Sequence, residues 1–343
     1  MHQLLNTLYI TTEGAYLHLD HDTLKVEVEK ETKLQVPMHH LGGIVCFGNV
    51  MVSPFAMHRC AEDGRFLVLL DRNGRFKARI EGPVSGNVLL RLAQHEAMGN
   101  PEKTLSIAKN IVAGKLQNSR QISLRGAREA DDPSDAGPLK ETADTIGNAL
   151  SRLDACHDLD QVRGIEGESA RTYFSSFDRM VREDRESFKL NGRNRRPPLD
   201  RINALLSFLY ALVMNDCVAG VEGVGLDPQM GFLHAIRPGR AALALDLMEE
   251  VRSVIADRLA LTLINRKQIQ AKHFMDRPGG AVHLDDDGRK EVVVAYQKRK
   301  QEEITHPLLN QKMPLGLIPH VQARLLARTL RGDMKEYIPF LYR

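Results

Sequence analysis

The chain has 343 residues, of which 43% are hydrophobic and 27% charged, and its formal net charge is +3. This composition is that of a globular protein and excludes a largely disordered chain, while the length favours two compact domains. The small net charge excludes a strong global field, so any nucleic acid has to be held by local clusters of basic residues.

The first eighty residues predict β-structure. Apolar residues alternate with charged or polar ones over 24–28 and again over 34–38, which is the period of half-buried strands. Before them, the apolar stretches 8–10 and 16–19 predict a hairpin that turns near Gly14.

A short helix is predicted from Ser53 to Asp63, because serine favours the N-cap and the proline after it favours the first turn. Two strands follow at 66–70 and 76–80, joined by a turn at Gly74.

From residue 85 the apolar spacing becomes helical and stays so almost to the C-terminus. We therefore expect an α+β fold with an N-terminal β-rich domain over 1–84 and a larger, mainly α-helical domain over 85–343. Residues 130–138 are predicted as a polar loop, and 282–284 as part of a small hairpin that continues into the acidic stretch after it.

Four cysteines lie far apart without CxxC spacing, namely Cys46, Cys60, Cys156 and Cys217. This pattern predicts reduced core thiols in a cytoplasmic protein rather than a zinc site or a disulfide framework. No apolar run approaches the roughly 18 residues of a membrane span, and the N-terminus has no signal-peptide pattern, so we expect no membrane association.

Three segments carry groups that could bind a metal. Glu166 lies between two glycines where a helix is expected to start, His234 lies in an apolar loop, and Asp246, Glu249 and Glu250 share one helix face. Each has an ordinary alternative: a helix N-terminal glutamate, a hydrogen-bonded structural histidine, and a solvated polar face. Together they are a candidate divalent-metal site, and oxygen ligands with one imidazole suit Mn²⁺ or Mg²⁺ better than structural zinc.

Local basic clusters are candidates for DNA binding. Arg193, Arg195 and Arg196 form one cluster, and Arg324 and Arg328 lie one helical turn apart. Arginine can hold phosphate through two parallel hydrogen bonds. The alternative is that these residues are solvated or pair with acidic neighbours.

Eight segments, in this order and spacing, carry a family resemblance. They are 66–75 (FLVLLDRNGR), 164–167 (GIEG), 196–207 (RPPLDRINALLS), 225–228 (GLDP), 231–234 (GFLH), 246–250 (DLMEE), 322–328 (QARLLAR) and 337–340 (YIPF). On these segments the chain resembles the CRISPR-associated integrase, the DNA-cutting and joining subunit of the spacer-acquisition module. The sequence of these segments most resembles that of the type I-C branch.

The resemblance implies that the β-domain dimerises and that the helical domain is catalytic. It implies Glu166, His234 and Glu249 as ligands of Mn²⁺ or Mg²⁺, with Asp246 in support and Glu250 as a less favoured ligand. It also implies DNA as a partner, both foreign fragments and the repeat array, together with a small ferredoxin-like adaptation protein flanked by two dimers of the integrase.

The predicted function is a metal-dependent DNA endonuclease and integrase that joins foreign DNA fragments into a CRISPR repeat array by phosphodiester transesterification. Two alternatives stay open at this point. One is a metal-dependent DNA repair nuclease, and the other is a non-catalytic DNA-binding scaffold of the same fold.

Overall fold

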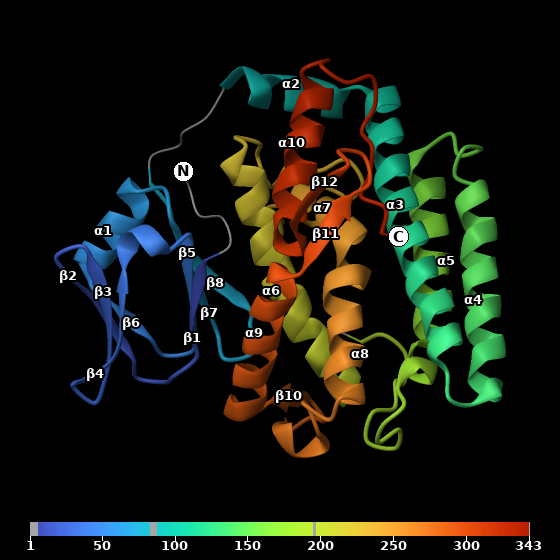
Figure 1. Cartoon of the computed structure of the whole chain (residues 1–343). Helices are drawn as coiled ribbons and strands as arrows, with labels where there is room; N and C mark the ends of the chain where they lie inside the picture. The colour runs from blue at the N-terminus through green and yellow to red at the C-terminus, as the bar shows by residue number, and fades with distance from the viewer. Residues whose placement is uncertain (1–5, 83–87, 195–196, 343) are drawn as a thin grey trace. The chain divides into compact units, whose positions relative to one another are not determined.

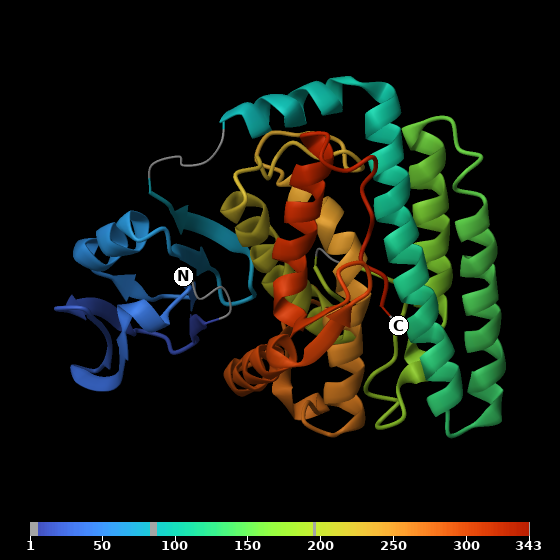
Figure 2. The same ribbon diagram turned by 45° about the horizontal axis from the view of Figure 1, so that its top comes forward.

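A computed structural model describes residues 6–82, 88–194 and 197–342 (Figures 1 and 2). The chain divides into two compact units, residues 1–85 with 284–294 and residues 86–283 with 295–343. Strands dominate the first unit and helices the second, so the predicted α+β fold class is confirmed. Residues 284–294 group with the strand-rich unit, whereas the sequence analysis placed them in the helical domain.

The strand-rich unit contains two four-stranded sheets. The first has the order β1 (Thr7–Ile10), β5 (Gly43–Phe47), β7 (Phe66–Leu70), β8 (Phe76–Ile80), and only the β7–β8 pair is antiparallel. The second has the order β4 (Glu31–Pro37), β3 (Thr23–Val28), β2 (Tyr16–Asp20), β6 (Met51–Val52). Leu17 and Leu24 of one sheet and Ile44 and Leu67 of the other are fully buried in one shared apolar core.

The predicted hairpin around Gly14 is wrong. Strand β1 pairs in parallel with β5, and β2 pairs with β3 and β6, so the chain changes sheets after Ile10. The predicted helix is confirmed as α1 (Pro54–Glu62), where Ser53 Oγ accepts a hydrogen bond from Ala56 N at 3.2 Å. The turn between β7 and β8 is also confirmed, with Gly74 at a φ of 79° that favours glycine.

The helical unit is built around two neighbouring groups of helices. Its long helices are α2 (Val88–Gly99), α3 (Pro101–Glu129), α4 (Pro133–Ser151), α5 (Leu159–Ser175), α6 (Arg201–Gly223), α7 (Ala242–Arg252), α8 (Arg258–Asn265), α9 (Asp286–Gln301, whose first part groups with the other unit) and α10 (Ile318–Leu330). Helices α3, α4 and α5 pack side by side, α6 packs against α7 and α10, and α3 also contacts α7 (Figure 1). Short helices and strands complete it: η2 (Phe177–Met180), η3 (Ser253–Asp257), β9 (Phe274–Asp276), β10 (Val282–Leu284), β11 (Glu303–His306) and β12 (Gln311–Pro314).

Two connections differ from the sequence predictions. The polar loop predicted over 130–138 is only a short break, because Asp132 caps α4 by accepting a hydrogen bond from Ser134 N at 2.8 Å. Strand β10 pairs with the preceding β9, and the acidic residues after it begin α9 instead of a returning strand. Asp285 Oδ1 accepts from Gly288 N at 2.7 Å, which is a helix-start contact.

Helix α6 is long and apolar enough to cross a membrane by length and composition, but 61% of that stretch is buried inside the protein. Its buried residues contact α7 and α10, as expected of a core helix. The four cysteines are free and buried, as predicted.

Acid should destabilise the protein through His306. Its buried ring has Nε2 3.1 Å from Gln322 Oε1, and its Nδ1 accepts from Leu309 N at 3.3 Å, which suits the neutral imidazole. Burial lowers the pKa of His306. The unfolded chain therefore takes up the proton more readily, and the free energy of unfolding falls as the pH drops through about 6.5.

Urea unfolding between about pH 7.5 and about pH 5 measures this effect. The free energy of unfolding of His306→Gln should fall less steeply as the pH drops. Part of the fall should remain, because burial also lowers the pKa of His320. Equal pH slopes for the wild type and His306→Gln would contradict the assignment.

Candidate metal centre

Glu166 lies in the middle of α5, not at the helix start that the sequence predicted. The helix begins seven residues earlier at Leu159, where Asp158 Oδ1 accepts from Gln161 N at 2.8 Å. Val162 and Ile165 bury the inner face of the helix against the neighbouring helices. Glu166 lies beside this face, with 26% of its side chain exposed, so it can meet both protein groups and an incoming ligand.

His234 is held by Asp246 of α7. The Asp246 carboxylate accepts hydrogen bonds from Phe232 N at 2.6 Å, Leu233 N at 3.0 Å and His234 N at 3.0 Å. The loop can approach this closely because a Cβ on Gly231 would lie 2.8 Å from Asp246 Oδ2.

The same carboxylate orients the imidazole. His234 Nδ1 lies 2.7 Å from Asp246 Oδ1, which leaves Nε2 as the free nitrogen, 3.9 Å from Glu249 Oε1. A carboxylate behind a histidine fixes the ring and its tautomer in this way when the other nitrogen is a ligand.

The acidic face of α7 is buried, which corrects the reading of a solvated polar face. Asp246 and Glu250 have no exposed surface and Glu249 retains 4%. They are buried because α7 is enclosed by α3, α6 and α10. Helix α7 then continues into η3, a π-helical turn, and such turns are frequent at functional sites.

Glu249 is held between two cations. Its Oε1 lies 3.1 Å from a guanidinium nitrogen of Arg252, and its Oε2 lies 2.7 Å from Lys115 Nζ. Burial by itself would raise the pKa of Glu249, but the charges of Arg252 and Lys115 outweigh it and lower that pKa to about 2. Glu249 is therefore ionised.

Glu250 points the other way and holds the C-terminal segment. It accepts hydrogen bonds from Tyr337 Oη at 2.5 Å, Phe340 N at 2.8 Å and Gln322 Nε2 at 2.9 Å. Burial raises its pKa to about 8. The segments 337–340 and 322–328 therefore have a structural role, because their residues hydrogen-bond Glu250. Glu250 does not join the group formed by Glu166, His234 and Glu249.

Lys115 was not predicted from the sequence as a site residue. This residue of α3 is 3% exposed, and its ammonium hydrogen-bonds Glu166 Oε1 while lying 2.7 Å from Glu249 Oε2. The only sequence signal was a lysine within a helical apolar stretch, between Val112 and Leu116. Through this ammonium the structure brings Glu166 and Glu249 together, with His234 beside them.

The arrangement fits a divalent cation on chemical grounds. No group of three His, Cys, Asp or Glu side chains within residues 6–82, 88–194 and 197–342 is already closed around a metal position. However, a positive group already lies between the two carboxylates, and Glu249 Oε2 is buried without a hydrogen bond of good geometry. Two carboxylates and an imidazole nitrogen are ligands that Mn²⁺ or Mg²⁺ accepts, whereas structural zinc favours sulfur and nitrogen.

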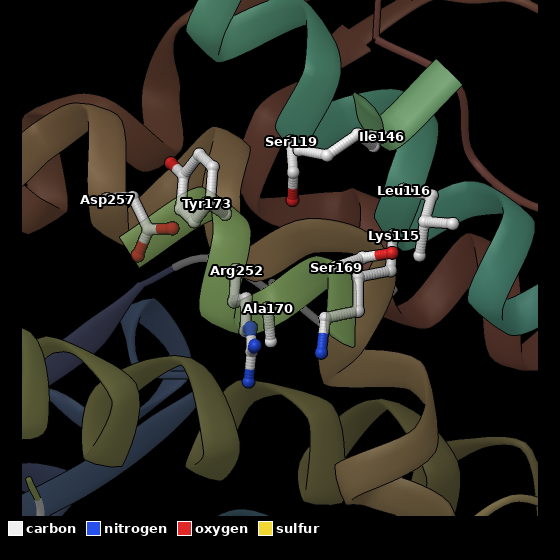
Figure 3. Close-up of a pocket in the computed structure, with 9 residues that line it drawn as sticks. All are labelled: Lys115, Leu116, Ser119, Ile146, Ser169, Ala170, Tyr173, Arg252 and Asp257. Atoms are coloured by element: carbon white, nitrogen blue, oxygen red, sulfur yellow. The ribbon is translucent and has the colours of Figure 1, made fainter. Parts of the chain in front are cut away.

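A water-sized cavity of about 10 Å³, lined by both polar and apolar side chains, lies next to Lys115 and Arg252 (Figure 3). Ser169 and Tyr173 of α5 line it, and their hydroxyl oxygens are buried without a hydrogen-bond partner. Such a cavity holds about one water molecule.

The predicted DNA-binding arginines differ in their surroundings. Arg324 and Arg328 are exposed on α10 and form no salt bridge within the described part of the chain, so they are available to phosphates. Arg193 is half-buried, so it is not simply a solvated surface charge. Arg195 and Arg196 lie outside the described residues.

Arg193 packs inside the helical unit because its guanidinium lies 5.2 Å from the Tyr210 ring and 5.8 Å from the Phe174 ring. It also donates to Asn203 Oδ1 at 2.5 Å. We therefore expect Arg193→Gln to lower the free energy of unfolding by about 2 kcal/mol, from the lost charged hydrogen bond and cation–π contacts.

Urea unfolding measures this loss, with Arg324→Gln as the control that changes stability by less than about 0.5 kcal/mol. If both variants match the wild type, the Arg193 contacts do not stabilise the fold.

Known proteins with similar sequences identify the family to which this chain is related. The family described as CRISPR associated protein Cas1 matches residues 8–298. A CRISPR-associated endonuclease Cas1 of Moorella thermoacetica is 62% identical over 343 residues, and one of Chlorobaculum tepidum is 46% identical, each over the whole of both chains.

Solved structures agree in fold. A Cas1 protein from Thermotoga maritima has a TM-score of 0.82 at 25% identity and covers 97% of this chain and 98% of its own. A casposase bound to an integration product has a TM-score of 0.83 at 22% identity, covering 98% of this chain and 94% of its own.

Proposed function

The chain belongs to the Cas1 family of CRISPR-associated proteins, and from this premise we propose that its helical unit is a metal-dependent DNA endonuclease and integrase. The observation that carries the proposal is that the Lys115 ammonium joins Glu166 to Glu249, while His234 Nε2 lies 3.9 Å from the other carboxylate oxygen of Glu249. The endonuclease names of relatives at 62% and 46% identity support it.

Glu166, His234 Nε2 and Glu249 would hold Mn²⁺ or Mg²⁺. The bound ion would polarise the target phosphate and stabilise the charge that develops there. Asp246 keeps the imidazole turned toward Glu249 through its contact with Nδ1. Arg252, fixed 3.1 Å from Glu249, keeps that carboxylate in place and adds positive charge beside the phosphate.

The reaction is an in-line displacement at phosphorus. A DNA 3′-hydroxyl attacks the repeat phosphodiester, the new P–O bond forms as the old one breaks, and the displaced 3′-oxygen leaves on the repeat strand. Water in place of the hydroxyl gives cleavage. No serine, tyrosine or cysteine nucleophile is required.

Incubation of the protein with Mn²⁺, a labelled fragment and a repeat-containing duplex tests the proposal. A joined product supports the integrase function, cleavage without joining supports the repair nuclease, and neither in the presence of tight DNA binding supports the scaffold. The joining assay is repeated with the partner protein, because the Cas1–Cas2 complexes with which this fold is shared contain one.

We further propose that this chain is cytoplasmic and belongs to the type I-C branch. It would work with a small ferredoxin-like adaptation partner and dimerise through its strand-rich unit. Strand β4 is an edge strand with five exposed residues, and unpaired edges of this kind join to other strands. Joining both ends of a fragment requires two active subunits, which a symmetric dimer supplies.

Light scattering should therefore give twice the 38.5 kDa chain mass. A mass of one chain at micromolar concentration would contradict the dimer.

A further inference from the structure

A second electropositive site lies in the helical unit. A cleft of about 510 Å³ opens between the end of α3, η2, α8 and the end of α9. Its lining contains two glutamates and six arginines, Arg125, Arg179, Arg182, Arg258, Arg266 and Arg299. The lining therefore has a balance of +4, more than the +3 of the whole chain, and none of the metal-centre residues belongs to it.

Pairing inside the cleft leaves part of this charge unmatched. Arg125 pairs with Glu129 at 2.6 Å and Arg299 pairs with Glu302, which uses both glutamates. Arg179 pairs with Asp135, outside the lining, at 3.3 Å, so Arg182, Arg258 and Arg266 are the lining arginines that form no salt bridge within the described part of the chain. Arg299 is only 9% exposed, and its Nε is buried without a hydrogen-bond partner.

Arg258 is the central unmatched charge. Within the described residues its guanidinium forms no salt bridge and hydrogen-bonds the Tyr342 hydroxyl, with the ring centre 5.5 Å away. Burial and the neighbouring charges of Arg299 and Arg125 lower the pKa of Arg258, so an anion there would relieve an existing repulsion. Arg182 and Arg266 are exposed at the mouth of the cleft.

The chemistry of the lining selects phosphate. Guanidinium groups bind phosphate oxygens through two parallel hydrogen bonds, and several of them converge here. Apart from the two glutamates, the other lining residues are apolar or small and polar, and none of the lining residues is an aromatic ring on which a base could stack.

We infer that this cleft binds consecutive phosphate groups of a DNA backbone, at a site separate from the metal centre. The inference rests on the proposed function for the statement that the bound nucleic acid is DNA. The backbone is the expected partner because several guanidinium groups converge in the cleft and its lining contains no aromatic ring for base stacking.

The test is a salt titration of a labelled duplex, without divalent metal so that the metal centre contributes little. We compare the full-length wild type with Arg258→Gln and with the exposed double variant Arg182→Gln/Arg266→Gln. Arg128→Gln is the matched control, because Arg128 is exposed on α3 outside the cleft. Each lost phosphate contact should reduce the slope of log affinity against log salt by about 0.9.

Inorganic tripolyphosphate separates a free polyphosphate from a DNA strand. It should raise the melting temperature of the wild type and of Arg128→Gln, but not of Arg258→Gln. Slopes equal to the control in both cleft variants would overturn the inference. Lost tripolyphosphate stabilisation with an unchanged DNA slope would overturn the assignment to DNA.

Cleavage of a short duplex with Mn²⁺ is measured in parallel. If the wild type does not cut but the cleft variants still lose slope, the proposed function fails and the DNA-binding cleft stands. If the wild type cuts and the cleft variants bind as the control does, the cleft inference alone fails.

Discussion

Replacing Glu166 by glutamine should lower Mn²⁺-dependent DNA cleavage by about a thousandfold. Glutamine keeps the size of the side chain but removes the negative charge that it shares with Glu249 around the Lys115 ammonium. A metal-held transition state gains several kcal/mol, and each 1.36 kcal/mol is tenfold in rate, so loss of one charged ligand gives about this factor.

Glu168→Gln is the matched control. It makes the same chemical change two residues along α5, where the exposed Glu168 only pairs with Arg152 at the surface. Single-turnover cleavage of a duplex, with urea unfolding of each variant alongside, separates catalysis from folding. Equal activity of Glu166→Gln and Glu168→Gln would remove Glu166 from the metal centre.

The strands and helices that depend on local signals could be predicted from the sequence. Ser53 and its proline define α1, and Asn73-Gly74 defines the β7–β8 turn, because caps and turns are settled by a few neighbouring residues. The hairpin at Gly14 could not be predicted, since β1 pairs with β5 more than thirty residues away and no local pattern encodes that partner.

The same distinction applies to the metal centre. Its carboxylates and histidine are separated along the chain. Their chemistry made them a candidate site, and the family resemblance selected Glu249 among the acidic residues of α7. Periodicity predicted a solvated acidic face on α7, but the face is buried because α3 packs over it. The charges that make this burial possible come from Arg252, one turn along the same helix, and from Lys115, which lies 134 residues before Glu249 and has no motif of its own.

Lys115→Met should destabilise the metal-free protein. The substitution leaves Glu249 buried with Arg252 alone and removes the hydrogen bond to Glu166. Removing one partner of a buried ion pair costs about 3–5 kcal/mol, and the lower end applies because Arg252 remains and Glu166 is partly exposed.

Mn²⁺ should recover most of that loss. In the wild type the ammonium lies between the two carboxylates and competes with a cation for them, whereas in Lys115→Met the cation becomes their only shared partner. Binding at about a hundred times the dissociation constant stabilises a folded protein by about 2.7 kcal/mol. Urea unfolding in EDTA and in Mn²⁺, with Lys103→Met on the exposed start of α3 as the control, measures both effects. A Mn²⁺ stabilisation no larger in Lys115→Met than in the wild type would mean that Lys115 and the metal do not share one position.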